Sequence, residues 1–415
     1  MADQHRMGKI NFALFPTTLH ANFPTPARFA HRPRVGLNLT NKIVFMSVFN
    51  PLHKIPVGIL GATGMVGQNY LKLLINHPWF EIKFLAASEK SAGKTYKEAT
   101  SEKWILDQTL PENIAKMMVY NVSEIKKSVE NCRLVFSCFE GGSKEQIQDT
   151  EIAYAKAGLL VVSNASAHRW TSNVPIIVPE INPNHLDILK VQKQIYGFDM
   201  GAIVVKPNCS IQTFMLPIEA LKQAGFEVKK ILVTTLQASS GAGYPGVPSL
   251  DLIDNIVPFI GGEEDKTENE PLKIWGEIKA NIIQNSNQTI ISATCTRVSV
   301  ISGHTASVSL EFGAKKPSLE EIQKIWKNFL APKISRNLPS SPKQLISYKT
   351  EENRPQPRRD RNLENGMGVV VGRLRECSIL DVKFVCLSHN LVRGAAGGGV
   401  LNAELLVASG FVPTI

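Results

Sequence analysis

Residues 55–67 have the sequence IPVGILGATGMVG, a short apolar run that leads directly into three spaced glycines. The run 55–60 predicts a buried strand, and apolar residues follow the glycines at helical spacing: Leu71, Leu74 and Ile75. Gly61 would permit a tight turn, Gly64 would let the backbone approach a pyrophosphate, and Gly67 would let helix and strand pack closely. An ordinary glycine-rich turn has a similar sequence, but the strand before and the helix after favour a phosphate-binding loop.

The alternation of strand and helix continues along the chain. Buried strands are predicted at 82–87, 134–139 and 159–163, and a helix is predicted near 143–157. Strands separated by helices indicate a parallel sheet with crossover helices on its faces. We therefore expect a Rossmann-type dinucleotide-binding domain over residues 55–205.

The end of the second predicted strand bears on the choice of cofactor. A site that prefers NAD places an acidic residue there to bind the ribose 2′-hydroxyl, and this sequence has Ser88 instead. Hydroxyl groups and a nearby lysine suit a 2′-phosphate, so the sequence favours NADP. Glu89 keeps NAD open as an alternative, because a small shift of the loop would turn it toward the ribose. A plain surface turn would have a similar sequence.

A second stretch, KPNCSIQ at residues 206–212, sets one thiol where a strand gives way to a helix. Residues 202–205 predict the strand, and apolar residues recur at helical spacing from Ile211. Cys209 would then lie in the first helical turn, where free backbone N–H groups and the helix dipole favour a thiolate. A reactive nucleophile is one interpretation, and a small buried core residue is the other.

Beyond Cys209 the pattern changes to long alternating segments. Residues 229–236 and 294–312 alternate, which predicts an antiparallel or mixed sheet with one open face. A helix is expected near 249–257. Asn390 begins a run of small residues, which predicts a helix that can approach another backbone or a ligand closely.

The composition limits the classes of function. The 415 residues are 43% hydrophobic and 20% charged, as in globular proteins, and their number points to two domains. No apolar run approaches the roughly 20 residues of a membrane helix. The six cysteines lack metal-finger spacing, which predicts free thiols in a reducing compartment and no metal site. Half of the net charge of +10 lies in residues 1–50, which lack the interleaved aromatics of a nucleic-acid surface.

Residues 1–54 precede the first predicted strand and have no convincing period. Several prolines and the lack of a secretory apolar core predict a disordered extension. Its arginine-rich, acid-poor composition also resembles a mitochondrial presequence, and Met46 is an alternative start of the chain. We expect a dispensable extension on a cytoplasmic protein, with an organellar protein as the alternative.

Eight motifs stand in order within residues 55–412: GATGMVG (61–67), SAGK (91–94), NASAHR (164–169), VPEIN (178–182), PNCS (207–210), LQASSGAGYPG (236–246), RVSVISGHT (297–305) and SHNLVRGAAGGGVLNAELL (388–406). Together they resemble the aspartate-β-semialdehyde dehydrogenase family, especially its fungal and archaeal branch. The resemblance implies an α/β Rossmann-type NADP-binding domain at 55–205, completed by a C-terminal helix within 389–415. It also implies an α+β catalytic and dimerisation domain at 206–388, similar to that of glyceraldehyde-3-phosphate dehydrogenase.

The resemblance also implies roles for individual residues. Cys209 would be the nucleophile that becomes acylated, Gln237 would orient the substrate, and His304 would be the general acid/base. The implied substrate-binding residues are Arg297 for the α-carboxylate, Glu263 for the amino group, Arg169 and Lys266 for the phosphate, and Asn208. The implied cofactor-binding residues are Gly61, Ala62, Thr63, Gly64, Met65, Val66, Gly67, Ser88, Ser91, Ser240, Gly241 and Asn390.

The implied reaction is the NADPH-dependent reductive dephosphorylation of L-4-aspartyl phosphate to L-aspartate 4-semialdehyde through a cysteine thioester, in the pathway to threonine, methionine, isoleucine and lysine. A reductase of another acyl phosphate or acyl-CoA, such as N-acetylglutamyl phosphate or malonyl-CoA, is an alternative. Glu263 and Lys266 together favour a charged amino-acid phosphate over a CoA thioester. A non-catalytic NADPH-binding regulator is the second alternative.

Two further features complete the expectations. Glu140 departs from the family pattern, and it would face either the nicotinamide ribose or solvent. A homodimer or homotetramer is implied, because the second sheet would otherwise expose an apolar face.

Overall fold

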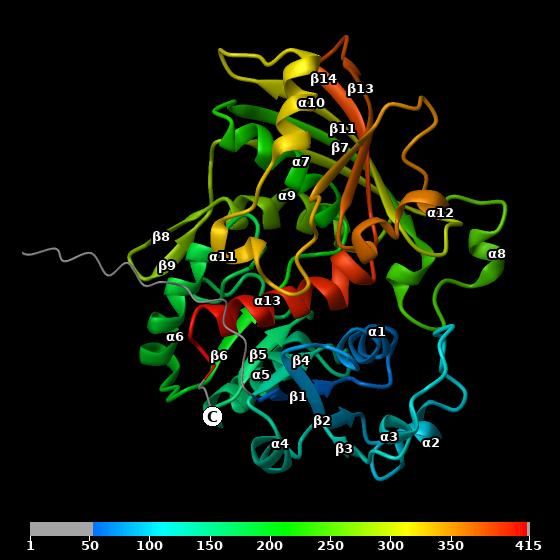
Figure 1. The fold of residues 1–415 in the computed structure, drawn as a ribbon, viewed down its shortest axis with the longest axis vertical. Helices are drawn as coiled ribbons and strands as arrows, with labels where there is room; N and C mark the ends of the chain where they lie inside the picture. The colour runs from blue at the N-terminus through cyan, green and yellow to red at the C-terminus, as the bar shows by residue number, and fades with distance from the viewer. Residues whose placement is uncertain (1–52, 413–415) are drawn as a thin grey trace, which may run out of the picture. The chain divides into compact units, whose positions relative to one another are not determined.

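Two six-stranded sheets organise the described part of the chain (Figure 1). The computed structural model describes residues 53–412, and these residues belong to one compact unit. The predicted disordered extension, apart from its last two residues, lies outside the described range. Within residues 53–412, no helix has the length and apolar character needed to cross a membrane.

The first sheet is parallel throughout, with strand order β3-β2-β1-β4-β5-β6. Its strands are β1 (Ile55–Leu60), β2 (Phe80–Ala87), β3 (Val119–Asn121), β4 (Leu134–Ser137), β5 (Leu160–Ser163) and β6 (Ala202–Val205). This is the order of a doubly wound dinucleotide-binding sheet, whose winding reverses between β1 and β4. Ligands bind such sheets at the carboxyl ends of the strands near this reversal. The predicted Rossmann-type fold is confirmed.

Helices cover both faces of the first sheet. One face carries α1 (Met65–Leu74) and α13 (Gly397–Ala408), and the other carries α4 (Ile125–Asn131) and α5 (Lys144–Lys156). Three further helices lie in the same stretch of the chain: α2 (Tyr96–Thr100), α3 (Glu112–Ala115) and α6 (Leu189–Tyr196). The helix predicted near 143–157 corresponds to α5, whose N-cap Ser143 accepts a hydrogen bond from the backbone N–H of Gln146.

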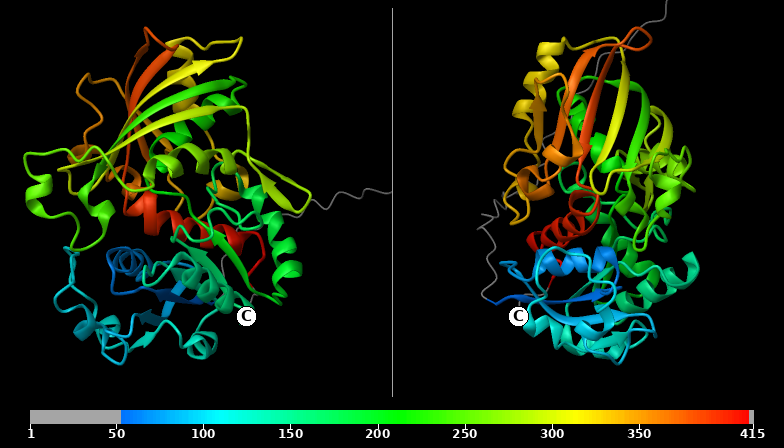
Figure 2. Two further views of the ribbon diagram at one scale, coloured as in Figure 1. Left: turned by 180° about the vertical axis from the view of Figure 1, so that it is seen from behind. Right: turned by 90° about the vertical axis from the view of Figure 1, so that its right-hand side faces the viewer.

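The helix α13 packs against α1 and β5, although it lies near the other end of the sequence. In Figures 1 and 2 it lies between the two sheets. Its buried Glu404 accepts hydrogen bonds from Ser340 and lies 2.7 Å from Nε2 of buried His77, which follows α1. These contacts fix α13 to the first sheet's side of the molecule.

The second sheet is mixed, with strand order β10-β7-β11-β14-β13-β12. Its strands are β7 (Val228–Ala238), β10 (Ile290–Val298), β11 (His304–Phe312), β12 (Ile346–Lys349), β13 (Val369–Glu376) and β14 (Val382–Ser388). A separate hairpin pairs β8 (Glu277–Lys279) with β9 (Ile282–Gln284). The α-helices after β6 and before α13 are α7 (Ile211–Gln223), α8 (Ser249–Leu252), α9 (Glu263–Ile274), α10 (Leu319–Asn328), α11 (Lys333–Arg336) and α12 (Pro357–Asp360).

One face of the second sheet packs on α7 and α10, and the rear view in Figure 2 shows its strands in front of these helices. The outward side chains differ from the expected apolar face. Leu232 and Ile290 are 50% and 67% exposed, but they alternate with hydroxyl side chains: Thr234, Ser292, Thr294 and Ser307. The open face predicted from the alternation is therefore present, and its surface is mixed.

The helix predicted near 249–257 is shorter than expected. It ends at Leu252, because Ile253 is already extended and Asp254 has a left-handed φ of 58°. The chain then continues as a loop to the N-cap of α9 at Gly262.

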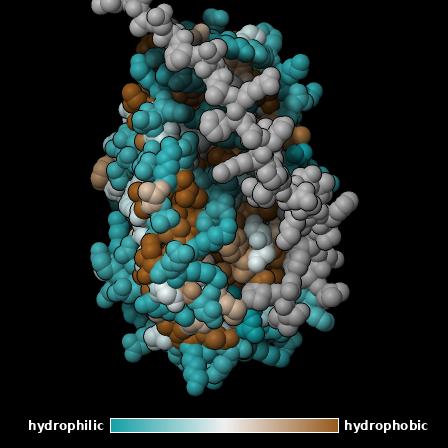
Figure 3. All heavy atoms as spheres, turned by 90° about the vertical axis from the view of Figure 1, so that its left-hand side faces the viewer, coloured by the Kyte–Doolittle hydropathy of each residue, from teal (hydrophilic) through white to brown (hydrophobic). Residues whose placement is uncertain are grey.

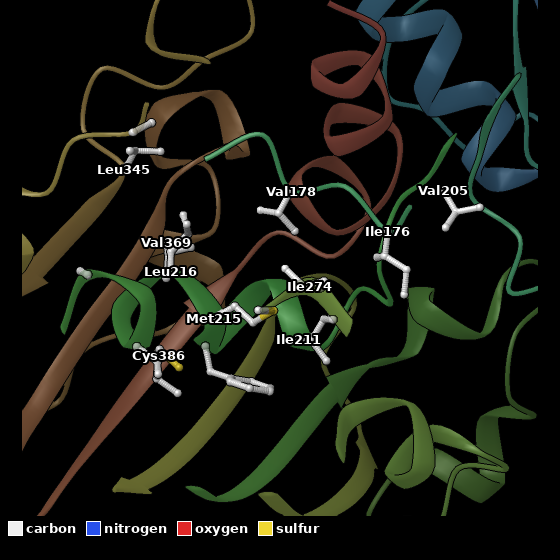
Figure 4. Packing of buried hydrophobic residues seen from close by; sticks show 14 of the residues in the cluster. Ile176, Val178, Val205, Ile211, Met215, Leu216, Ile274, Leu345, Val369 and Cys386 are labelled. Carbon is white, nitrogen blue, oxygen red and sulfur yellow. The ribbon is translucent and has the colours of Figure 1, made fainter. Parts of the chain in front are cut away.

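One hydrophobic cluster joins the two sheets through α7 (Figure 4). The helix is buried on every side from Ile211 to Leu221, as expected for a helix that is apolar all round. Figure 4 shows Ile211 and Met215 of this helix between Val205, which ends β6, and Cys386, which lies on β14. The start of α7 is therefore held against both sheets.

Candidate active site

Two adjoining cavities lie where the first sheet faces α9 and the second sheet. One has a volume of about 750 Å³ and the other of about 510 Å³. They adjoin because they share wall residues from the glycine loop, the end of β4 and the loop after β7: Met65, Val66, Cys138, Phe139, Glu140, Ala242 and Gly243. We call the larger one the loop cavity and the smaller one the thiol cavity.

The glycine loop shapes the loop cavity. Gly61 has a φ of +87°, and a Cβ there would lie 2.7 Å from the backbone of Cys138. A Cβ on Gly67 would lie 2.3 Å from the carbonyl oxygen of Gly61, so a side chain would force α1 away from β1. The N-cap of α1 is Gly64, which offers no side-chain cap, and the first turn has no acidic residue. These uncapped N–H groups at a positive helix end fit the pyrophosphate of a dinucleotide.

Most of the predicted cofactor residues lie in the cavity walls. Gly61, Thr63, Gly64, Met65, Val66 and Ser88 line the loop cavity, and Ser240, Gly241 and Asn390 line the thiol cavity. Ala62, Gly67 and Ser91 line neither cavity and are buried.

Glu140 is exposed and lies in the walls of both cavities. Lys103 and Asn121 line the loop cavity and were not predicted. Asn121 ends β3, so the rule that ligands bind at carboxyl strand ends could have found it.

The thiol cavity contains a cysteine–histidine pair. Cys209 lies between β6 and the N-cap of α7, and its Sγ is 3.2 Å from Nε2 of His304, the first residue of β11. The backbone N–H of Ala238 donates to Nδ1 of His304 at 3.0 Å. Since Nδ1 accepts, the neutral imidazole carries its proton on Nε2 and donates it toward the sulfur.

Burial sets the charge state of this pair. His304 is fully buried, and burial followed by the cations Arg297 and Lys206, with His389, lowers its pKa to about 3. Burial and then Glu263 raise the pKa of Cys209, although Lys206, Arg169 and Arg297 act in the opposite direction. The pair therefore consists of a neutral thiol beside a neutral imidazole. The expected thiolate at a helix start is wrong, because desolvation outweighs the helix and the cations.

One face of α9 supplies several charged groups to the site. Glu263, Lys266 and Glu270 are spaced three and four residues apart, so they share this face. Lys266 Nζ lies 2.9 Å from a carboxylate oxygen of Glu263. Burial would raise the pKa of Glu263, but Lys266 and hydrogen bonds from Gln237 and Asn208 hold it below its usual value. Glu263 is therefore charged at neutral pH, and the helical spacing could have identified Glu270.

Asn208 holds the backbone beside the thiol. Its side-chain amide donates to both carboxylate oxygens of Glu263 at 2.9 and 3.0 Å, and its backbone N–H donates to Glu270 at 2.6 Å. Glu270 also accepts a hydrogen bond from Arg169 at 2.9 Å. Gln237 donates to Glu263 at 3.2 Å. Each of these groups thus contacts another member of the same network.

Arg297 lies on β10 and projects into the same cavity. Its Nη1 donates to the carbonyl oxygen of Ala238 at 2.8 Å, and no carboxylate within residues 53–412 lies within 4.0 Å of it. A Cβ on Gly241 would lie 2.7 Å from this Nη1, so only a glycine leaves the guanidinium in place. The guanidinium remains available for a carboxylate of a ligand.

The start of the C-terminal helical segment closes the site from another side. A Cβ on Gly394, in the π turn η4 (Val392–Ala396), would lie 2.8 Å from Cβ of Cys209. Asn390 donates to Oγ of Ser240 at 2.8 Å and accepts from the backbone N–H of Gly303 at 2.8 Å. The small residues predicted after Asn390 therefore allow a close approach to the thiol.

The structure brings the predicted catalytic and substrate-binding residues together. Arg169, Asn208, Cys209, Gln237, Glu263, Lys266 and Arg297 line the thiol cavity, and His304 lies behind Cys209. Lys206 also lines this cavity and was not predicted, although it stands in the quoted stretch around the cysteine. Among residues 53–412, no cluster of histidine, cysteine and acidic side chains could hold a metal ion.

Comparison with known proteins places this arrangement in a family. Residues 56–189 match the family model described as semialdehyde dehydrogenase, NAD binding domain, and residues 218–393 match semialdehyde dehydrogenase, dimerisation domain. The chain is 42% identical to aspartate-semialdehyde dehydrogenase of Cryptococcus neoformans over 368 residues, which is 88% of this chain and all of that protein. It is 44% identical to the Archaeoglobus fulgidus enzyme over 351 residues, covering 85% of this chain and 97% of that protein.

A solved structure agrees with the sequence comparisons. The crystal structure of aspartate-semialdehyde dehydrogenase with NADP from Candida albicans matches with a TM-score of 0.79 and 39% identity, covering 87% of this chain and all of that one. The predicted family, with its fungal and archaeal relatives, is confirmed by these identities. With this coverage, and with the thiol, histidine and glycine-loop geometry described above, the chain belongs to the aspartate-semialdehyde dehydrogenase family.

Proposed function

We propose that this chain is an NADP-dependent enzyme that reduces L-4-aspartyl phosphate to L-aspartate 4-semialdehyde through a thioester on Cys209. The observation that carries the proposal is the contact of 3.2 Å between Cys209 Sγ and His304 Nε2, in a cavity that adjoins a dinucleotide-fitting loop. Residues 55–205, completed by 389–415, would form the cofactor domain, and 206–388 the catalytic domain.

Charged groups in the thiol cavity orient the substrate. Arg297 has no carboxylate partner in the described chain, so its guanidinium is free to bind the substrate α-carboxylate. Glu263, which is charged, binds the substrate ammonium group. Arg169 and Lys266 face the phosphate, and Gln237 and Asn208 hold Glu263 in place. Such positioning supplies much of the rate enhancement before any bond changes.

Cys209 carries out the first chemical step. Its sulfur attacks the acyl carbon, a C–S bond forms, and the C–O bond to phosphate breaks. The thiol proton leaves with the phosphate, which departs as hydrogen phosphate. The product of this step is a thioester on Cys209, so one difficult reduction becomes two easier steps.

His304 acts on the same sulfur and on the carbonyl oxygen. Its Nε2–H, held in donor form by the N–H of Ala238, stabilises negative charge that develops on either atom. NADPH, when bound, supplies the hydride that reduces the thioester. The C–S bond then breaks, the semialdehyde leaves, and Cys209 takes a proton from solvent. The glycine loop and Ser88 would hold the cofactor, with Ser240, Gly241 and Asn390 near its nicotinamide end.

A homodimer fits the domain that residues 218–393 match, and a tetramer is the larger assembly that we also consider. Leu232 and Ile290 on the open face of the second sheet would be covered by a second copy. Figure 3 shows a further face on which apolar side chains form patches among hydrophilic ones. We propose a cytoplasmic location, because all six cysteines are free thiols.

The test is an assay of the purified chain with aspartate semialdehyde, phosphate and NADP, followed by nicotinamide absorbance. Turnover is expected, and Cys209→Ala should abolish it while NADP binding persists. Cys377→Ala is the matched control, because Cys377 is a partly exposed thiol outside both cavities. No absorbance change between about pH 6 and 9, which spans the histidine and cysteine titrations, would refute the proposed function.

A further inference from the structure

We propose that Lys206 is a further substrate-binding residue, whose ammonium group pairs with the phosphate of the acyl phosphate. The proposal rests on the proposed function, since it assigns one more residue to the same site. It depends on the position of Lys206, on the pairing of the charges around it, and on its ionisation.

Lys206 lies directly after β6, three residues before the thiol. Its side chain lines the thiol cavity, and the residue is only 3% exposed. A lysine is rarely buried unless it is paired, because desolvation of its charge is strongly unfavourable. Yet the group that Nζ contacts is the carbonyl oxygen of the next residue, Pro207. A buried ammonium with a neutral main-chain acceptor leaves its charge uncompensated.

The other charges of the cavity confirm this imbalance. Four basic residues line it, Arg169, Lys206, Lys266 and Arg297, against two acidic ones, Glu140 and Glu263. Arg169 lies 2.9 Å from Glu270, and Lys266 lies 2.9 Å from Glu263. Within residues 53–412, Lys206 and Arg297 have no carboxylate within 4.0 Å. The cavity therefore has two unpaired cations.

The substrate has two anionic groups, an α-carboxylate and a phosphate. The planar fork of Arg297 matches the carboxylate, which leaves Lys206 for the phosphate. Among the charged groups, Arg169 has the largest effect on the pKa of Lys206, so the two cations are neighbours. Nε of Arg169 is buried without a partner in the described chain. Two adjacent cations with an unused donor form a site for an anion with several oxygens.

The ionisation of Lys206 gives the site a measurable property. Burial, followed by Arg169, lowers the pKa of Lys206 to about 7, and Cys209, Glu270 and Glu263 act in the opposite direction. A phosphate binds the charged form, so binding requires that Lys206 be protonated. The affinity for phosphate should therefore fall as pH rises through about 7.

The experiment compares Lys206→Met, Lys206→Arg and the exposed control Lys190→Met. Iodoacetamide alkylation of Cys209 is followed by mass spectrometry at pH 6.5–8.5, and inorganic phosphate is the probe. The quantity measured is the phosphate concentration that halves the alkylation rate, which does not depend on the rate without phosphate. Lys190 suits the control because its side chain is 76% exposed and pairs with Asp187 outside the site.

Lys206→Met should raise the half-protecting phosphate concentration by roughly ten- to a hundredfold, as expected for loss of a charged hydrogen bond. Lys206→Arg should restore protection, and it should lose the steep fall above pH 7, because arginine stays charged. Phosphate itself ionises in the same way in the assays of the wild type and of every variant. A difference between the pH profiles of two proteins therefore reports the ionisation of Lys206. The KM for phosphate in the oxidative assay should follow the same order.

An unchanged half-protecting concentration in Lys206→Met, within twofold of the wild type, would overturn the proposal. If that variant is misfolded by circular dichroism, the pH profile of Lys206→Arg decides alone: a profile identical to the wild type overturns the proposal. Protection needs no turnover. A wild type that phosphate protects but that does not oxidise aspartate semialdehyde would refute the proposed function and leave this site standing.

Discussion

Replacing His304 by glutamine or alanine distinguishes hydrogen-bond donation from proton transfer. The backbone N–H of Ala238 donates to Nδ1 of His304, so Nε2 carries the proton that faces Cys209 Sγ at 3.2 Å. A glutamine amide can place an N–H near the position of Nε2, whereas alanine cannot. If His304 is a donor, glutamine should therefore preserve part of the function that alanine removes.

The magnitudes differ between the two roles. A hydrogen bond to a charged group is worth about 1.5–3 kcal/mol, which is roughly 10–150-fold in rate. His304→Ala should lower kcat by this factor, and His304→Gln should remain within about tenfold of the wild type. Loss of general acid/base catalysis would cost about 10²–10⁴-fold in both variants alike.

The pH profile supplies a second measurement. Because burial and nearby cations lower the pKa of His304 to about 3, the imidazole stays neutral above about pH 4. No inflection near 6.5 is therefore expected from it in kcat/KM of the free enzyme. The assay is the initial rate of NADPH formation from aspartate semialdehyde and phosphate, with His185→Gln as the control for a buried histidine outside both cavities. Equal losses above about 10³-fold in both His304 variants would refute the donor role.

Three further predictions concern the cofactor, the pH dependence of stability and a buried ion pair. Ser88→Asp should lower kcat/KM for NADP by at least tenfold relative to kcat/KM for NAD, because the carboxylate would repel the 2′-phosphate of NADP. An unchanged ratio of the two kcat/KM values would contradict the placement of the 2′-phosphate beside Ser88. Burial lowers the pKa of His168 to about 4, so its protonation favours the unfolded chain, and stability should fall as pH drops from about 6.5 toward 4. His168→Asn should reduce this loss by on the order of 2 kcal/mol in urea unfolding, and equal slopes for both proteins would refute it. Arg393→Met leaves buried Glu180 without its partner at 2.7 Å and should cost about 3–5 kcal/mol of unfolding free energy, whereas a loss under 1 kcal/mol would refute this prediction.

The sequence predicts those parts of the fold that local periodicity encodes. The strand and helix around Gly61–Gly67, the helix near 143–157 and the strand before Cys209 are each found close to their predicted bounds. The length of α8 could not be predicted in this way, because the left-handed backbone of Asp254 ends it.

The site was predicted as far as its residues stand in motifs. Glu270 was missed because the charged segment after Gly262 was not recognised as a helix with one functional face. The charge state of Cys209 was also beyond the sequence, since it depends on desolvation by groups that are distant in the chain. Motif order thus identifies which residues meet, while their ionisation follows only from how tightly they are enclosed.

The position of α13 has a consequence for biosynthesis. Residues 55–205 leave the ribosome long before residues 397–408. Part of one face of the first sheet therefore stays uncovered until α13 has been synthesised. Val400, Leu401 and Leu405 are almost completely buried there, and until they arrive their partners remain exposed to water. Contacts this distant in sequence form late and slowly. A nascent chain that stalls before residue 397 therefore exposes an aggregation-prone apolar surface. A chaperone would protect the chain at this stage of synthesis.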